Sequence, residues 1–320
     1  MTNTHRLWRP LLWLAKRLKR RPSLEGWKNK ALVAQGAVAA MQLRALTQLE
    51  TLADAEFSIF SQWGEDGIIE WFVQNSRGIP ERFVEFGVED YKESDTHFLL
   101  SYRNWLVIDG SAENVDIIKS DAISWRHDLA STAAFINTDN INQLIMVGGL
   151  SGEIGILSID LDGVDYWIWE AYPGRSVDRI VEYNAVYGDL LALVTPYDPM
   201  FVRGLAYPLH LYCGASIGAL VRLGRRKGYT LVGSNRAGNN AFFVRDDRAA
   251  ALLSLIADSA PRPSLFREGR DAGGHLSLVS GRARSQLIMG CRVIDVATGR
   301  EGPLKSFGGI YGPRWGSVLN

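Results

Sequence analysis

The chain has 320 residues, and its 35 Lys and Arg balance its 35 Asp and Glu, although residues 1–30 carry nine basic side chains against one acidic side chain. With 47% hydrophobic and 22% charged residues, the composition excludes a disordered or low-complexity chain, and two cysteines exclude a disulfide framework or a structural zinc site. The rest of the chain is acidic on balance, which argues against general binding of DNA or RNA, because that requires a basic groove.

The first element that the sequence predicts is an amphipathic helix over residues 6–21. Its leucine and tryptophan side chains share one face, and its arginines lie opposite. This pattern is typical of a helix in a membrane interface, so we expect contact with an anionic membrane surface. The alternatives are a solvated tail and a helix docked on the acidic body. The longest apolar run here, Leu11–Ala15, is far shorter than the ~20 residues that cross a bilayer. The expected location is therefore cytoplasmic, at the cytoplasmic face of the membrane if the helix binds lipid.

The chain divides into parts of different pattern. Residues 27–55 are rich in Ala and Leu and predict a long helix, which would serve as a stalk or as a homo-oligomer contact. We therefore expect a helical N-terminal part (1–56), an α/β domain (57–250) and a β-rich C-terminal extension (251–320) with glycine-rich turns.

From residue 57 onward, short apolar segments alternate with helical segments. Such runs of four to six residues, separated by helices, indicate buried parallel strands in βαβ units. The expected strands are Arg82–Gly87, Trp105–Asp109, Thr132–Ile136, Ile154–Ile159 and Asp178–Tyr183. The expected helices are Ile68–Val73, Asp95–Arg103, Ala112–Ser120, Asn140–Val147 and Asp165–Tyr172.

The end of the α/β domain breaks this alternation. A helix over Ala215–Lys227 leads to two strand-like segments, Tyr229–Gly233 and Ala241–Arg245, which a short polar turn joins. Strands so joined must be antiparallel. The sequence therefore predicts a Rossmann-like, mostly parallel sheet of seven strands with a terminal antiparallel hairpin.

The residues after the strands matter most, because ligands of open α/β sheets bind beyond the carboxyl ends of the strands. After the first strand, Glu85 offers a carboxylate to a cationic amino group, and Gly87 lets a ligand approach the backbone. After the second strand, Asp109 has the spacing to bind ribose hydroxyls. Ser111 is either a further cofactor contact or the N-cap of the next helix.

Three further residues are candidates for the site. Asn137 and Asp139 follow the third strand, where the edge of an adenine would be bound, although Asp139 would equally cap the next helix. His210 lies between Tyr207 and Tyr212, before the last helix, and is a candidate base on a substrate loop.

The fourth strand is followed by three carboxylates, Asp160, Asp162 and Asp165, and the fifth strand by Glu182. Like charges so close are unfavourable unless a cation or a proton offsets their repulsion. Asp160, Asp162 and Glu182 would therefore ligate a hard cation such as Mg²⁺ or Mn²⁺. Alternatively, one of these acids is the general base that removes a hydroxyl proton, or Asp165 caps a helix while Asp160 binds backbone amides.

These segments together resemble the FkbM-like family of class I S-adenosylmethionine-dependent methyltransferases. The likeness runs from Phe60 to Arg248 and is carried by V-E-F-G at 84–87, V-I-D-G-S at 107–111, I-D-L-D-G at 159–163 and V-E-Y-N at 181–184. The resemblance implies an O-methyltransferase that acts on a hydroxyl of a sugar, glycan, glycolipid or other small molecule.

The resemblance also implies roles for the candidate residues. Glu85 and Gly87 would face the methionine part of the cofactor, and Asp109 its ribose. Asp160 and Asp162 would border the reaction centre, as catalytic residues.

Two other functions stay open. Asp160-Leu-Asp162 also resembles the Asp-x-Asp of glycosyltransferases, which holds a metal-bound nucleotide sugar. A second glycine is absent after Gly87, where Glu89 and Asp90 stand instead, and this favours a non-catalytic Rossmann-like scaffold at a membrane.

Overall fold

The structure is a computed structural model that describes residues 24–76, 78–101, 104–148 and 152–319. The predicted membrane helix over residues 6–21 lies outside these described residues. Among the helices that are described, none combines the length and the apolar character needed to cross a membrane.

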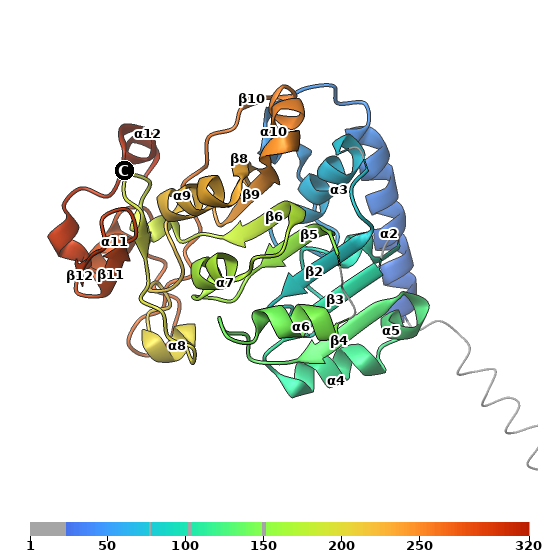
Figure 1. The fold of residues 1–320 in the computed structure, drawn as a ribbon, viewed down its shortest axis with the longest axis horizontal. Coiled ribbons are helices and arrows are strands. Elements are labelled where there is room, and N and C mark those ends of the chain that lie inside the picture. Colours follow the sequence, from blue (N-terminus) through green and yellow to red (C-terminus); the bar gives the residue numbers. More distant parts are fainter. Residues whose placement is uncertain (1–23, 77, 102–103, 149–151, 320) are drawn as a thin grey trace, which may run out of the picture.

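In the described part of the chain, seven strands form one central sheet in the order β4-β3-β2-β5-β6-β9-β8 (Figure 1). The five strands from β4 to β6 are parallel, whereas β9 is antiparallel to both of its neighbours, β6 and β8. The mostly parallel sheet with an antiparallel hairpin is confirmed. The strands are β2 (Arg82–Phe86), β3 (Asn104–Asp109), β4 (Leu129–Ala133), β5 (Ile154–Ile159), β6 (Ser176–Glu182), β8 (Tyr229–Ser234) and β9 (Asn240–Arg245).

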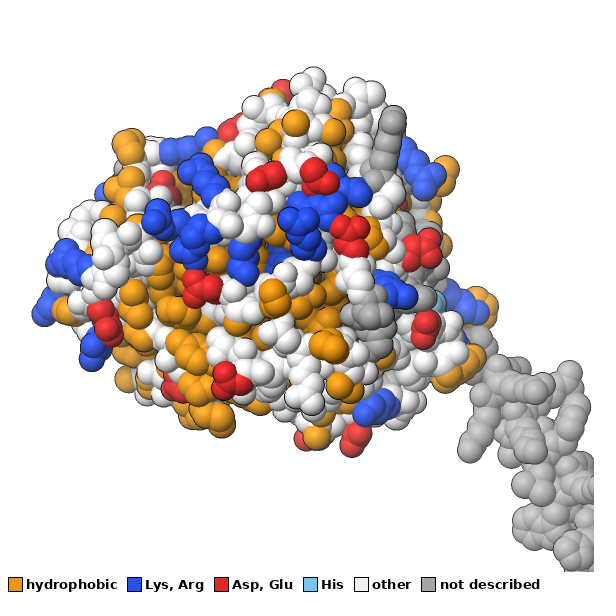
Figure 2. All heavy atoms as spheres, in the orientation of Figure 1, with side chains coloured by type: hydrophobic (Ala, Val, Ile, Leu, Met, Phe, Trp, Pro, Cys, Tyr) orange, Lys and Arg blue, Asp and Glu red, His pale blue; other side chains and the backbone are white. Residues whose placement is uncertain are grey.

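Helices cover both faces of this sheet. One face packs against α6 (Ile141–Val147), α7 (Asp165–Ala171) and α9 (Ile217–Lys227). The other packs against the end of α2 (Leu24–Leu43) and against α3 (Glu65–Asn75), α4 (Ala112–Ser120) and α10 (Asp246–Leu253). Charged side chains lie on the outward faces of α9 and α10, as Figure 2 shows. The short α5 (Ile123–Arg126) follows α4.

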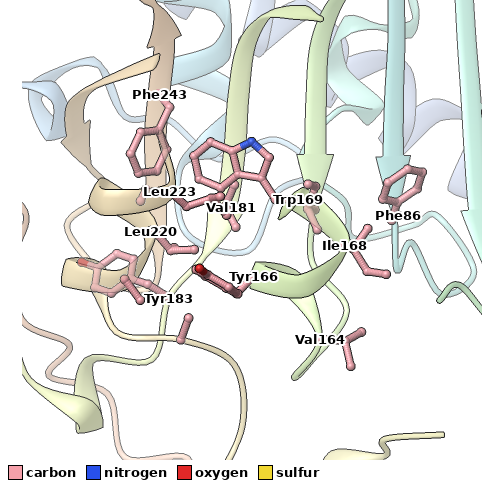
Figure 3. Packing of buried hydrophobic residues seen from close by; sticks show 14 of the residues in the cluster. Phe86, Val164, Tyr166, Ile168, Trp169, Val181, Tyr183, Leu220, Leu223 and Phe243 are labelled. Atoms are coloured by element: carbon pink, nitrogen blue, oxygen red, sulfur yellow. The ribbon is translucent and has the colours of Figure 1, made fainter. Parts of the chain in front are cut away.

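The core on the α7 side is built around Trp169, whose side chain is fully buried. Its ring lies 4.9 Å from that of Phe243 on β9 and close to Leu223 of α9 (Figure 3). Burial of one such side chain stabilises a fold by roughly 2–3 kcal/mol. This packing fixes the helix that follows the acidic loop after β5, and so fixes the position of that loop.

The N-terminal helix is shorter than predicted. Instead of a helix over 27–55, α2 ends at Leu43, and β1 (Leu49–Thr51) and the 3-10 helix η2 (Leu52–Ala55) follow. Asp54 accepts a hydrogen bond from the amide of Thr51 in a capping box that starts η2. Pairing of β1 with a distant strand and this local cap together outweigh the helical preference of the Ala- and Leu-rich segment.

Other elements also differ from prediction in extent: α3 spans Glu65–Asn75 rather than 68–73, and two further differences have a clear structural cause. The third parallel strand, β4, spans Leu129–Ala133 rather than 132–136, because its hydrogen-bond register against β3 begins at Leu129 and ends at Ala133. The helix expected over 95–103 is the 3-10 helix η3 (His97–Ser101). The chain before η3 instead bonds to Glu85, as described below.

The C-terminal segment is joined to the rest of the molecule by strand pairs. Within the described residues, β10 (Ile256–Asp258) pairs in parallel with β1, and β11 (Arg292–Asp295) pairs with β12 (Arg300–Pro303) and β7 (Leu193–Val194). The remaining elements are η4 (Ala185–Tyr187), α8 (Arg203–Ala206), α11 (Ala283–Leu287), η5 (Leu304–Phe307) and α12 (Pro313–Val318).

Candidate functional site

An acidic triad lies at the carboxyl ends of two neighbouring strands. Because β5 and β6 are parallel and adjacent, the residues that follow them meet at one edge of the sheet. Carboxylate oxygens of Asp160, Asp162 and Glu182 all lie within 4.8 Å of one another. The structure thus brings together the three residues that the sequence predicted as cation ligands.

Asp165 does not belong to the triad. Its carboxylate accepts hydrogen bonds from the backbone amides of Leu161, at 2.7 Å, and Gly163, at 3.0 Å. Asp165 is fully buried at the start of α7, and burial raises its pKa to about 6. The amide-binding role considered for Asp160 therefore falls to Asp165, which fixes the loop that carries the other two acids.

Burial and mutual repulsion disfavour the ionised form of the triad carboxylates. Burial raises the pKa of Asp160 and of Glu182 well above the ordinary range, and the neighbouring carboxylates raise both further. In the described structure neither side chain accepts a hydrogen bond, so both are free to take a proton or to bind a cation.

A cation of the protein itself lies against the triad. Arg203, at the start of α8, donates from Nη1 to Asp162 at 2.8 Å and from Nη2 to Glu268 at 2.6 Å. Its Nε donates to the backbone carbonyl of His210 at 2.9 Å. No sequence pattern pointed to Arg203, because its partners are 41 and 65 positions away and no local motif connects them.

His210 takes part in the site through its backbone. Its φ of 58° places it in the left-handed region, and its carbonyl, rather than its imidazole, contacts Arg203. The imidazole lies beside Gly204, where an added Cβ would be 3.2 Å from the ring. The structure therefore shows His210 as a support for Arg203, and shows no contact of its ring with the triad.

The end of β2 is occupied by the chain's own groups. The carboxylate of Glu85 accepts hydrogen bonds from the backbone amide of Asp95 at 2.9 Å and from the hydroxyls of Ser94 and Thr96. Burial raises the pKa of Glu85 to about 7. The carboxylate predicted to face a cationic amino group thus organises the loop before η3.

Gly87 allows a close approach between two loops of the protein, not the approach of a ligand. Its φ is 75°, and a Cβ at this position would lie 1.7 Å from the backbone oxygen of Asp160. The loop after β5 therefore crosses directly over Gly87, where the sequence suggested that a ligand would approach.

Asp109, after β3, accepts three hydrogen bonds. The donors are the amides of Glu89 and Ser111, both at 2.8 Å, and Nδ2 of Asn114 at 3.1 Å. An ionised carboxylate offers about four acceptor positions, so one position remains for a ligand. A second position becomes available if the Asn114 side chain turns away. Ser111 caps α4 by accepting from the amide of Asn114 at 3.2 Å, which was its alternative role.

The polar segment after β4 forms a tight turn. Oδ1 of Asn137 accepts from the amides of Asp139 and Asn140, each at 3.0 Å. The side chain of Asp139 is exposed and does not cap α6, which starts after Asn140. Asn137 and Asp139 lie at the same edge of the sheet as Asp109, because β4 pairs in parallel with β3.

A small cavity of about 20 Å³ adjoins the triad, with room for about one water molecule. Glu182 and Arg203 line it from the α/β domain, and Phe266 and Glu268 line it from the C-terminal segment. Cys213 also lines it, and burial raises the pKa of this thiol, which keeps it protonated and a poor nucleophile.

Neither a protein-family model nor a curated protein matches the chain. Solved structures that resemble it include an S-adenosylmethionine-dependent methyltransferase from Clostridium acetobutylicum ATCC 824, 11% identical, with a TM-score of 0.39 over 57% of this chain and 90% of that one. The N-terminal domain of EvdMO1 with SAH bound is 13% identical, with a TM-score of 0.36 over 54% and 76%. The CcbJ methyltransferase from Streptomyces caelestis is 12% identical, with a TM-score of 0.32 over 62% and 98%. These likenesses are distant, so the function proposed below rests on the strand order and on the residues at the sheet edge.

Proposed function

We propose that this chain is an S-adenosylmethionine-dependent O-methyltransferase of the FkbM-like kind, acting on a hydroxyl of a sugar, glycan or glycolipid. The observation that carries the proposal is the strand order, in which the reversed strand β9 lies between β6 and β8. A dinucleotide-binding Rossmann sheet more often finishes with a parallel strand. Acidic residues at the ends of β2, β3, β5 and β6 add support, because they line one edge of this sheet.

The residues fit the cofactor best at its ribose end. Asp109 retains an acceptor position for a ribose hydroxyl, whereas Gly87 is covered by the loop after β5. When bound, S-adenosylmethionine supplies a methyl group that its sulfonium has already activated. The protein then has to position the acceptor and take up the hydroxyl proton, and the free carboxylates of Asp160 and Glu182 are placed to hold that proton.

The surface beside the triad suits an acceptor with an apolar part. The segment that carries Arg203 exposes Met200, Val202 and Leu205, with 70%, 43% and 84% of their surface accessible. Hydrophobic side chains also gather over α8 on the face shown in Figure 2. Exposed apolar groups next to a polar site are typical of contact with a lipid or another apolar partner, which supports a glycolipid acceptor.

The test is calorimetry with S-adenosylhomocysteine. We expect micromolar binding by the native protein and at least about a tenfold loss of affinity in Asp109→Asn, which removes negative charge at the ribose position. Asn114→Ala is the matched control, because it removes a neighbour of Asp109 but frees one of its oxygens, and it should bind as well as the native protein or better. Equal affinity of Asp109→Asn and the native protein would contradict the placement of the ribose.

A metal-dependent glycosyltransferase is the second candidate, and the triad geometry favours it. The same calorimetry with UDP and Mn²⁺ separates the two, since binding of UDP that requires Mn²⁺, without binding of S-adenosylhomocysteine, would support glycosyl transfer. Binding of neither ligand would leave the non-catalytic scaffold.

A further inference from the structure

We propose that Arg203 is the built-in cation of the acidic triad, supplying the positive charge that a divalent metal ion would otherwise supply and holding Asp162 in place. The inference goes beyond the proposed methyl transfer, because it concerns which cation the triad uses, and it argues against the metal-dependent second candidate.

The first step is the arrangement of charge. Three carboxylates within 4.8 Å of one another need a nearby positive charge or a proton. Nη1 of Arg203 lies 2.8 Å from Oδ1 of Asp162, and among the described residues this is the cationic side chain bonded to the triad. A metal ion on Asp160, Asp162 and Glu182 would have to share Asp162 with a guanidinium and would be repelled by it.

The second step is that the guanidinium is fixed. Its Nε, Nη1 and Nη2 each donate to a different acceptor, namely the carbonyl of His210 and the carboxylates of Asp162 and Glu268. The side chain is only 15% exposed. A planar fork held at three corners is a rigid charge, unlike a lysine ammonium, which contacts its partners as a mobile point charge.

The third step concerns the acids that remain. With Asp162 bonded to Arg203, Asp160 and Glu182 are the triad members without a hydrogen-bonded partner in the described structure. Of these two, Glu182 lines the cavity that Arg203 and Glu268 also line. Arg203 thus divides the triad into one carboxylate that is held and two that are available to the acceptor, and Glu268 ties the C-terminal segment to this arrangement.

The experiment measures Mn²⁺ binding by calorimetry, with the full chain and without any substrate. The native protein should not bind Mn²⁺ in the micromolar range. Arg203→Met should bind Mn²⁺ at least about tenfold more tightly than the native protein does, because the competing positive charge is gone. Arg203→Lys keeps the positive charge and should not gain the site. Arg245→Met is the matched control. Arg245 is paired with Glu153 and Asp247 at the end of the strands opposite to the triad, so this substitution should leave Mn²⁺ binding unchanged.

Two further variants tie the signal to the triad. The site gained in Arg203→Met should disappear when Asp160→Asn is added, and methylguanidinium should compete with Mn²⁺ in Arg203→Met. The proposal would be overturned if the native protein bound Mn²⁺ with micromolar affinity and the Asp160→Asn substitution abolished that binding. This measurement does not depend on the folding of any arginine variant. A folded Arg203→Met protein, checked by circular dichroism, that gains no Mn²⁺ binding would overturn it as well.

Discussion

Gly87 shows how a single missing side chain allows two loops to meet. A Cβ here would lie 1.7 Å from the oxygen of Asp160, and the backbone has a φ of 75°. Gly299 has the same φ of 75° but open space around it. We expect Gly299→Ala to cost about 1 kcal/mol for the left-handed backbone, and Gly87→Ala to cost at least ~2 kcal/mol more, because the loop after β5 must move.

Urea unfolding of the two variants checks this difference. Equal losses of stability would show that the loop after β5 yields without cost, and that Gly87 matters through its backbone conformation alone. The displaced loop carries Asp160 and Asp162, so Gly87→Ala should also weaken the contact between Asp162 and Arg203.

At the scale of single residues, the sequence predicts which strand end a residue occupies better than it predicts which groups that residue bonds to. Asp160, Asp162 and Glu182 come together as expected, because strand order alone decides which strand ends are neighbours. The contacts of Glu85 with the loop before η3 and of Arg203 with Asp162 depend on how loops fold over the sheet edge. No periodicity or spacing encodes those loop paths, so these partners could not be read from the chain.

The strand β6 carries two neighbouring buried side chains of ionisable residues, Asp178 and Arg179. Asp178 and Arg179 are neighbours in its middle and point to opposite faces. The Arg179 guanidinium lies against the rings of Trp169, Tyr172 and Tyr229, which offset part of its desolvation. Asp178 accepts no hydrogen bond from the described residues, and burial raises its pKa to about 8.

This strand gives a prediction about pH. The unfolded chain releases the Asp178 proton near pH 4, but the folded chain holds it until about pH 8. The contribution of Asp178 to stability should therefore fall as the pH rises between these values, by on the order of several kcal/mol in total, and change little above them. Asp178→Asn cannot ionise, so its stability relative to the native protein should increase from pH 5 to pH 8.

Chemical denaturation at several pH values measures this effect. Asp116→Asn, which removes a carboxylate at an exposed position of α4, supplies the comparison. A difference between Asp178→Asn and the native protein that stays constant from pH 5 to pH 8 would mean that Asp178 is ionised in the folded protein.

At the scale of elements, the pattern predicts those that pack on the central sheet. The spans of β5 and α4 agree with prediction residue by residue, because alternating buried segments and a Ser111 cap mark them locally. The end of α2 and the extent of β4 differ from prediction. The strand β1 replaces the predicted last part of the helix, and β1 and β4 both form through pairing with strands that lie elsewhere in the chain. Propensity over a short window contains no information about such a partner.

The whole molecule separates its charges. Acidic groups concentrate at the carboxyl edge of the sheet, whereas the last turn of α9 carries Arg225, Arg226 and Lys227, and basic side chains gather over this helix in Figure 2. The N-terminal residues add a further basic segment. The net charge of zero is thus the sum of regions with different partners, and a single value of pI does not describe the surface.

A vesicle experiment tests the basic segment. We propose that residues 6–21 bind an anionic membrane, with each basic residue near the surface contributing about 1 kcal/mol at low salt. Removal of residues 1–23 should therefore abolish sedimentation with phosphatidylserine vesicles and leave the affinity for S-adenosylhomocysteine unchanged. Neutral phosphatidylcholine vesicles are the control. Continued sedimentation of the shortened chain would assign membrane binding to the folded body.

The parallel pair of β1 and β10 has a consequence for how the protein is made. Leu49 pairs with Ile256, and Arg262 donates to the Thr51 hydroxyl, so β1 can form these contacts only after residues about 200 positions later in the chain are present. During synthesis β1 leaves the ribosome long before β10, and it remains an unpaired edge until most of the sheet has been translated. The segment that Arg262 begins also carries Glu268, the partner of Arg203. Glu268 follows the last strand of the central sheet in the chain, so a nascent or truncated chain that ends before it would have all seven strands but not this partner of Arg203.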